Sequence, residues 1–226
     1  MTDTLVKEGI KACQSDDFEK GVELFDQALA KDPKNIEAIY NRARALSKLS
    51  KLKEALIDFE LLVSLQPANA TFIGDYAVAL HLNEKNDEAK IKFDQALKLE
   101  PKNPYRWSSR AFFRDRTGNS KEAITDYEKA IELDPEDAIA LNNKGLIEEK
   151  LGYMERSKSS FDRSNKIVGY KPKTGTPNEQ IRSTSKTTTK EAEKLTCWKV
   201  VKSVFTKDGF NDFMHFTKNK LFGAKK

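Results

Sequence analysis

Apolar and polar positions alternate along most of the chain with the spacing of amphipathic helices. Residues 36–50 place apolar side chains three and four positions apart, a short polar turn follows, and residues 52–67 repeat the pattern. A proline then ends the second stretch, because proline lacks the amide hydrogen that a helix interior requires. The pattern therefore predicts pairs of helices, each pair joined by a short turn.

The same unit recurs every 34 residues. Five columns keep this spacing, and they hold a proline, an aromatic residue and three sets of mostly small residues. In chain order they are Pro33, Pro67, Pro101 and Pro135; Phe25, Phe59, Phe93, Tyr127 and Phe161; Gly21, Ala55, Ala89, Ala123 and Ser157; Gly9, Ala43, Ala77, Ala111 and Gly145; and Ala28, Leu62, Ala96, Ala130 and Ser164. One helix pair cannot bury its own apolar face, so stacking of successive pairs is expected to stabilise the array.

This array resembles the tetratricopeptide repeat family over about residues 2–168. The fourth repeat meets the family's pattern of large apolar, small, small, aromatic, small and proline residues with Trp107, Ala111, Ala123, Tyr127, Ala130 and Pro135. The first and fifth repeats depart from this pattern, as capping repeats do. The resemblance implies an all-α protein, folded as a right-handed α-solenoid of about five helix hairpins, that acts as an adaptor or scaffold for other proteins.

Charge divides the chain into unequal parts. Residues 1–168 hold 27 basic and 30 acidic residues, a net charge of −3, whereas residues 169–226 hold 13 and 5, a net charge of +8. We expect a five-repeat domain over 1–168, a Ser-, Thr- and Lys-rich flexible linker over 169–189, and a basic, aromatic helical segment over 190–226. Because the main body is not basic, nucleic acid is not an expected partner.

No pattern in the sequence points to catalysis. Residues 117–123 have glycine, serine and lysine in the wrong order for a phosphate loop. His81 and His215 lack the spacing of metal ligands, and neither Cys13 nor Cys197 has an evident base to activate it. We therefore expect a protein that is not an enzyme and holds no metal and no cofactor. So few cysteines, together with a polar N-terminal stretch, favour a cytoplasmic location.

The resemblance also implies where a partner binds. In this family the first helix of each pair lines a concave groove, and the positions that point into it carry over residue by residue. The expected partner-binding residues are Tyr40, Asn41, Arg44, Asp75, Val78, Tyr105, Ser109, Phe112, Asn142, Asn143 and Leu146. Aromatic rings, amides and an arginine suit a peptide or helix of another protein. The alternative is that these residues are ordinary solvated helix positions.

One class of partner is not expected. Members of the family that bind the C-terminal tails of the Hsp70 and Hsp90 chaperones hold a carboxylate with a set of Lys, Arg and Asn residues. This chain lacks that set, and Asp75 stands where it would repel a carboxylate. The expected ligand is therefore another protein or peptide, while the sequence leaves the oligomeric state undecided.

The C-terminal segment leaves three alternatives open. Its stripe of large apolar residues comprises Leu195, Trp198, Val201 and Phe205. The stripe is expected to dock on the solenoid, either in the groove or on the outer face of the last helix, where Phe161 is expected to be uncovered. Alternatively, it anchors the protein to a membrane surface, as basic amphipathic helices with Trp and Phe do.

Overall fold

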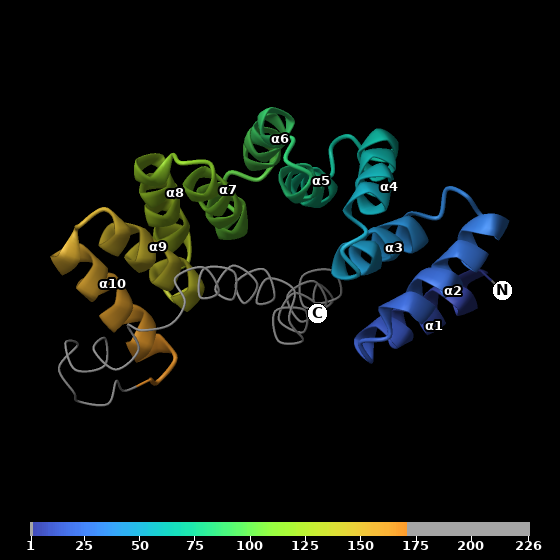
Figure 1. Cartoon of the computed structure of the whole chain (residues 1–226), viewed down its shortest axis with the longest axis horizontal. Helices are drawn as coiled ribbons and strands as arrows, with labels where there is room; N and C mark the ends of the chain where they lie inside the picture. Colours follow the sequence, from blue (N-terminus) through green and yellow to red (C-terminus); the bar gives the residue numbers. More distant parts are fainter. Residues whose placement is uncertain (1, 171–226) are drawn as a thin grey trace, which may run out of the picture. The chain divides into compact units, whose positions relative to one another are not determined.

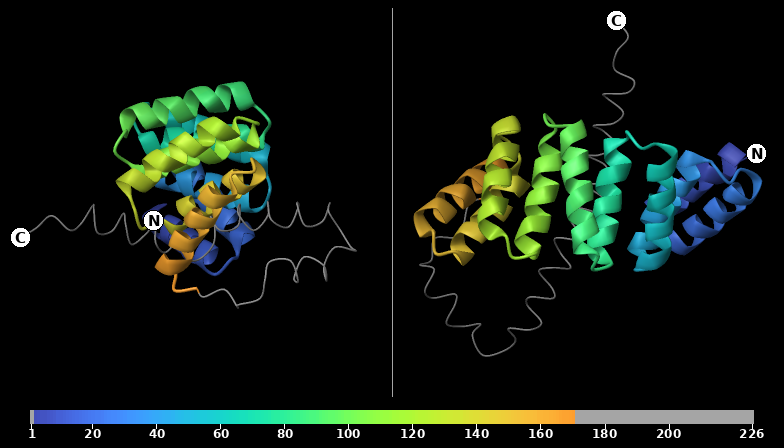
Figure 2. Two further views of the ribbon diagram at one scale, coloured as in Figure 1. Left: turned by 90° about the vertical axis from the view of Figure 1, so that its left-hand side faces the viewer. Right: turned by 90° about the horizontal axis from the view of Figure 1, so that it is seen from above.

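The structure, a computed structural model, describes residues 2–170. Within this range the chain forms ten α-helices and no strand (Figure 1). The helices are α1 (Thr2–Gln14), α2 (Phe18–Lys31), α3 (Ile36–Lys48), α4 (Leu52–Leu65), α5 (Ala70–Leu82), α6 (Asn86–Leu99), α7 (Pro104–Arg116), α8 (Ser120–Leu133), α9 (Ala138–Lys150) and α10 (Met154–Ile167). They form five consecutive pairs, which confirms the expected all-α repeat solenoid. In the right-hand view of Figure 2 the pairs follow one another in sequence order.

Four of the pairs begin with the same type of cap. A short polar side chain two residues after each repeat proline accepts a hydrogen bond from a backbone N–H in the first helical turn, which satisfies a donor that the helix leaves unpaired. These caps are Asn35, Asn69, Asn103 and Asp137. The proline and the cap together fix both the end of one pair and the start of the next.

The turn inside each pair also repeats. Its middle residue adopts a left-handed backbone conformation in all five repeats, at Asp16, Ser50, Glu84, Gly118 and Gly152. Only glycine adopts this conformation without steric cost, so the first three repeats hold it against the preference of their side chains.

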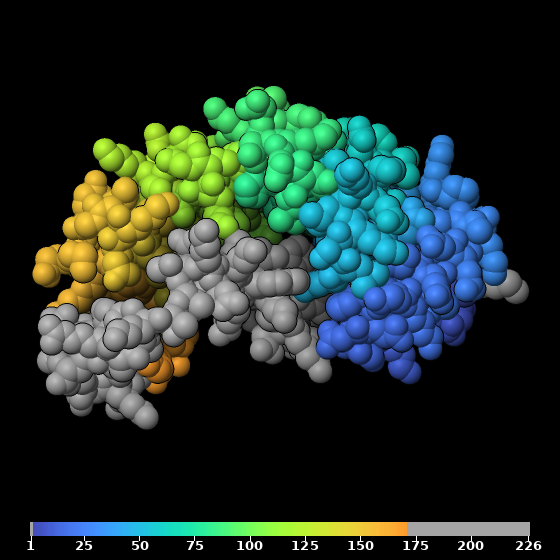
Figure 3. All heavy atoms as spheres, viewed as in Figure 1, coloured from blue at the N-terminus to red at the C-terminus, as the bar shows by residue number. Residues whose placement is uncertain are grey.

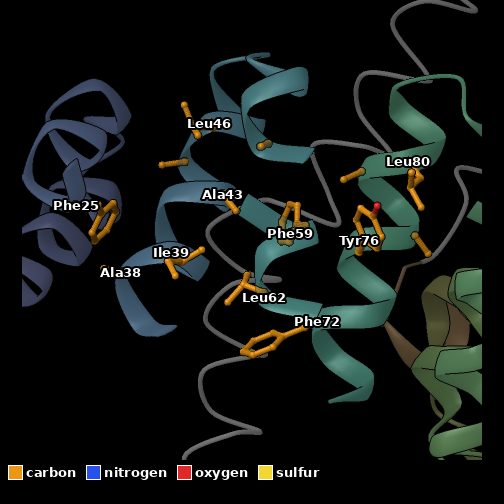
Figure 4. Close-up of a cluster of buried hydrophobic side chains, with 14 of the residues drawn as sticks. Phe25, Ala38, Ile39, Ala43, Leu46, Phe59, Leu62, Phe72, Tyr76 and Leu80 are labelled. Carbon is orange, nitrogen blue, oxygen red and sulfur yellow. The ribbon is translucent and has the colours of Figure 1, made fainter. Parts of the chain in front are cut away.

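The aromatic and small columns form the core between the helices. Phe25, Phe59, Phe93 and Tyr127 are all buried, and Figure 4 shows Phe25 and Phe59 among the apolar side chains of the neighbouring helices. Phe161 is half-buried rather than uncovered, because its ring lies directly over Gly145, where a Cβ would stand 2.8 Å from the Phe161 ring. The expectation that Phe161 lies on an open outer face is therefore wrong.

Ion pairs tie successive repeats together at one level of the array. Arg42 donates to Asp26 of the preceding repeat and, through two nitrogens, to Asp58 of its own repeat at 2.6 and 2.8 Å. Two repeats later, at the equivalent positions, Arg110 bridges Asp94 and Asp126 in the same way. These arginines extend each inter-repeat contact beyond the apolar core.

Candidate partner-binding face

The first helices of the five pairs together form one face of the helical body, here called the inner face. Helix α1 contacts α3, α5 contacts α7, and α7 contacts α9. Helices α3 and α5 meet through Tyr40, whose ring lies 5.2 Å from that of Phe72. In Figure 1 the helices α3, α5 and α7 lie on the inner side of the curved row, while α4, α6 and α8 lie on the outer side. Figure 3 shows that side chains fill the spaces between neighbouring helices.

Three of the expected binding residues meet in a polar cluster on α3 and α5. The Tyr40 hydroxyl donates a 2.8 Å hydrogen bond to Asp75, and the Arg44 guanidinium lies 5.4 Å from the centre of the Tyr40 ring. Tyr105 on α7 lies near Asp75, because burial, together with the Asp75 carboxylate, raises the pKa of the Tyr105 hydroxyl. Asp75 is therefore not an isolated charge that repels ligands, because a hydroxyl and an arginine already surround it.

The half-buried position of Asp75 predicts a pH effect on stability. Burial raises the pKa of the Asp75 carboxyl, while nearby Arg44 opposes the rise. The folded chain therefore holds this proton more tightly than the unfolded chain, so the carboxyl stabilises the fold at low pH and loses this effect as the pH rises through its folded pKa.

The substitution Asp75→Asn tests this effect. The amide oxygen still accepts from Tyr40 but cannot ionise, so the stability of the parent protein should fall relative to the variant as the pH rises from about 4 to neutral. Urea unfolding at a series of pH values measures the difference. Parallel stability curves for the two proteins would show that Asp75 does not titrate as described.

The second part of the inner face, on α7 and α9, is apolar and open to solvent. We call it the apolar strip, and it consists of Tyr105, Phe112, Ile139 and Leu146. Tyr105, Ile139 and Leu146 are 46%, 61% and 42% exposed, and Phe112 is half-buried. Residues seven apart share a helix face, and both Tyr105–Phe112 and Ile139–Leu146 have this separation. Large apolar side chains that neighbour one another and remain exposed are typical of interaction surfaces.

Ile139 was absent from the residues expected from the sequence. It stands at the repeat position that Tyr105 occupies one repeat earlier, so the 34-residue spacing was the signal that could have identified it. Its exposure makes it one of the most accessible apolar side chains on α9.

The remaining expected residues differ in how accessible they are. Asn41 donates to the Glu37 carbonyl of its own helix, and Asn143 interacts with the buried Tyr127 hydroxyl. Val78 is half-buried against the core, and Ser109 is also half-buried, beside Tyr105. Asn142 is exposed. Of the three asparagines, Asn142 is thus the most accessible to a partner.

The C-terminal part of the chain lies outside the described residues. This part comprises the segment 190–226, most of the linker 169–189, and the stripe of Leu195, Trp198, Val201 and Phe205.

Over residues 2–170, no three His, Cys, Asp or Glu side chains are grouped so that they could hold a metal ion. In the same range no helix is long and apolar enough to cross a membrane.

Comparisons with known proteins agree with the repeat pattern. Two family models match, one described as Tetratricopeptide repeat over residues 24–57 and one described as TPR repeat over residues 116–152. No sequence among the curated proteins matches this chain.

Solved structures share the fold at low sequence identity. MamA is 20% identical with a TM-score of 0.62, and the match covers 71% of this chain and 94% of MamA. TTC0263, a thermophilic TPR protein in Thermus thermophilus, is 17% identical with a TM-score of 0.62 and coverages of 75% and 92%. YrrB, a TPR protein with an unusual peptide-binding site, is 19% identical with a TM-score of 0.56 and coverages of 73% and 85%. With its five helix pairs and its matches to two repeat models, the chain belongs to the tetratricopeptide repeat family, whose helical repeats serve as scaffolds for protein–protein interaction.

Proposed function

We propose that this protein binds a peptide or a helix of a partner protein on its inner face. The observation that carries the proposal is the apolar strip, in which three large apolar side chains on two contacting helices remain more than two-fifths exposed. Contiguous exposed apolar side chains are costly to keep in water unless a partner covers them.

The polar cluster supports the same proposal. Tyr40, Arg44 and Asp75 place a hydroxyl, a guanidinium and a carboxylate beside the apolar strip. An apolar patch rimmed by hydrogen-bonding groups is the usual composition of an interface, since the apolar part supplies affinity and the polar part supplies orientation. The solved structure of YrrB, described as having an unusual peptide-binding site, makes a peptide a reasonable ligand class to test.

A pair of matched substitutions tests the proposed face. Ile139 on the inner face is 61% exposed, and Ile91, on the second helix of the third repeat, is 65% exposed. The full chain with Ile139→Asp is expected to capture its partners from a cell extract at least about tenfold more weakly, or about 1.4 kcal/mol. The control Ile91→Asp places the same charge at a similarly exposed isoleucine and should capture them normally.

The readout compares the two baits by quantitative pull-down, with circular dichroism confirming equal helicity. Equal capture by Ile139→Asp and Ile91→Asp would move the binding surface away from α9. Equal loss in both variants would point to the outer surface or to a general effect of added charge.

An alternative function is that of an adaptor held at a membrane surface. Its basis is the sequence of residues 169–226, which carry a net charge of +8, with Trp198 and five phenylalanines after residue 197. Basic aromatic segments bind anionic lipid surfaces. Co-sedimentation of the full chain with phosphatidylserine vesicles, compared with neutral vesicles, tests this function independently of the inner face.

A further inference from the structure

The contact between the third and fourth repeats differs from the other contacts between successive repeats. Helices α6 and α7 pack against each other less extensively than any other two consecutive helices in the described chain. The buried apolar residues also separate here into two clusters, one running from Val6 to Phe93 and Phe113, and the other from Ala111 to Ile147. The apolar core of the array is thus nearly interrupted at this junction.

The reason lies in two residues at the start of α7. The second, third and fifth repeats place buried apolar pairs at these positions, Ala38 with Ile39, Phe72 with Ile73, and Ala140 with Leu141. The fourth repeat has Arg106 and Trp107 instead. Trp107 is only half-buried, and its indole N–H donates to the Pro101 carbonyl at 2.9 Å. The apolar packing that joins the other repeats is therefore replaced here by polar groups.

Arg106 makes a buried polar contact across this junction, in addition to the more exposed Arg110–Asp94 bridge. It is 5% exposed, and its guanidinium donates to Glu100, at the end of α6, at 2.8 Å and to Thr71 on α5 at 2.9 Å. The guanidinium fits because Gly74 has no side chain, since a Cβ there would lie 2.8 Å from the nearest Arg106 nitrogen. Ring contacts of Phe113 remain, with Phe93 on α6 at 4.9 Å and with His81 on α5 at 5.2 Å.

Polar junctions open more easily than apolar ones. When an apolar interface separates, its full buried area meets water, whereas water replaces the hydrogen bonds of a polar interface at a small net cost for each bond. In a repeat array each repeat contacts only its neighbours, so one weak interface lets the two sides move as separate bodies.

We infer that the junction between α6 and α7 is a hinge within the helical body, held closed by Arg106. Repeats one to three form one rigid part, and repeats four and five form the other. On the inner face the hinge lies between Tyr40 and Asp75 on one side and Tyr105, Phe112, Ile139 and Leu146 on the other. One part of this inference rests on the proposed function. The hinge angle sets the distance between the polar cluster and the apolar strip, so a partner that contacts both can bind only when the hinge has one particular angle.

Pairs of spin labels measure this hinge without any partner, so the result is independent of the proposed function. Four exposed residues occupy the same repeat position on the second helices: Glu19, Lys53, Asp87 and Lys121. The pair Lys53→Cys with Lys121→Cys spans the hinge, and the pair Glu19→Cys with Asp87→Cys does not. Both pairs are 68 residues, or two repeats, apart. Both pairs are introduced into the full chain carrying Cys13→Ala and Cys197→Ser, so that only the introduced cysteines are labelled.

Double electron–electron resonance gives the distance distribution of each pair. The pair that spans the hinge is expected to show a distribution at least about twofold broader, or two separate maxima, since rigid bodies joined by a hinge sample several angles. Equally narrow distributions for the two pairs would overturn the hinge.

The substitution Arg106→Ala then tests the role of the arginine. Its loss should broaden the distribution of the 53–121 pair further and leave the 19–87 pair unchanged. An unchanged 53–121 distribution in a folded Arg106→Ala protein would show that Arg106 does not hold the junction.

Discussion

Replacing Phe93 by alanine is expected to lower the free energy of unfolding by about 3–5 kcal/mol, as truncations of large buried residues do. Phe93 is 4% exposed, and its ring lies 4.9 Å from that of Phe113 across the α6–α7 junction. The loss therefore combines a cavity with the removal of an aromatic contact between the two parts of the body. Urea unfolding followed by circular dichroism measures it.

Ile91→Ala on the same helix is the matched control. Ile91 is two residues from Phe93 but points into solvent, so its truncation should cost no more than about 0.5 kcal/mol. If Phe93→Ala were as mild as Ile91→Ala, the aromatic column would not be part of the core, and the assignment of the repeat positions would be wrong.

Local and periodic features of this fold were readable from the sequence. The 34-residue spacing predicted the five helix pairs, and the columns of small and aromatic residues predicted the core, because each depends on contacts that recur identically in every repeat. The same 34-residue spacing also relates residues that were not among those predictions. The caps Asn35, Asn69, Asn103 and Asp137 follow the prolines by two residues, and Ile139 repeats the position of Tyr105.

The features that depart from the period were not predictable in the same way. Arg106 occupies a column that holds Ala38, Phe72 and Ala140, and only the structure shows that its charge is satisfied by Glu100 and Thr71 from two other helices. The link from Tyr40 to Asp75 likewise spans 35 residues and depends on the rotation between successive repeats. Sequence spacing gives the helix face of each residue but not its partners on neighbouring helices.

Removing the carboxylate of Asp126 is expected to destabilise the protein by about 3 kcal/mol, although the site is polar. Asp126 is buried on α8 and accepts hydrogen bonds from Arg110 at 2.8 and 2.9 Å and from Arg114 at 2.9 Å. The substitution Asp126→Ala removes the buried carboxylate from both Arg110 and Arg114 and leaves Arg110 with the more exposed Asp94. The cost of removing one buried partner exceeds the net contribution of the intact pair.

Arg110 itself supplies the control, because it also binds Asp94 at 2.6 Å. The side chain of Asp94 is 47% exposed whereas that of Asp126 is 2% exposed, so Asp94→Ala should cost at most about 1 kcal/mol, as exposed ion pairs do. Urea unfolding of both variants gives the comparison, and the equivalent pair Asp58→Ala and Asp26→Ala around Arg42 repeats it in the second repeat. A similar loss for Asp94→Ala and Asp126→Ala would mean that burial does not govern these bridges. In that case the arginines would join the repeats through charge alone, and their contribution would fall with added salt.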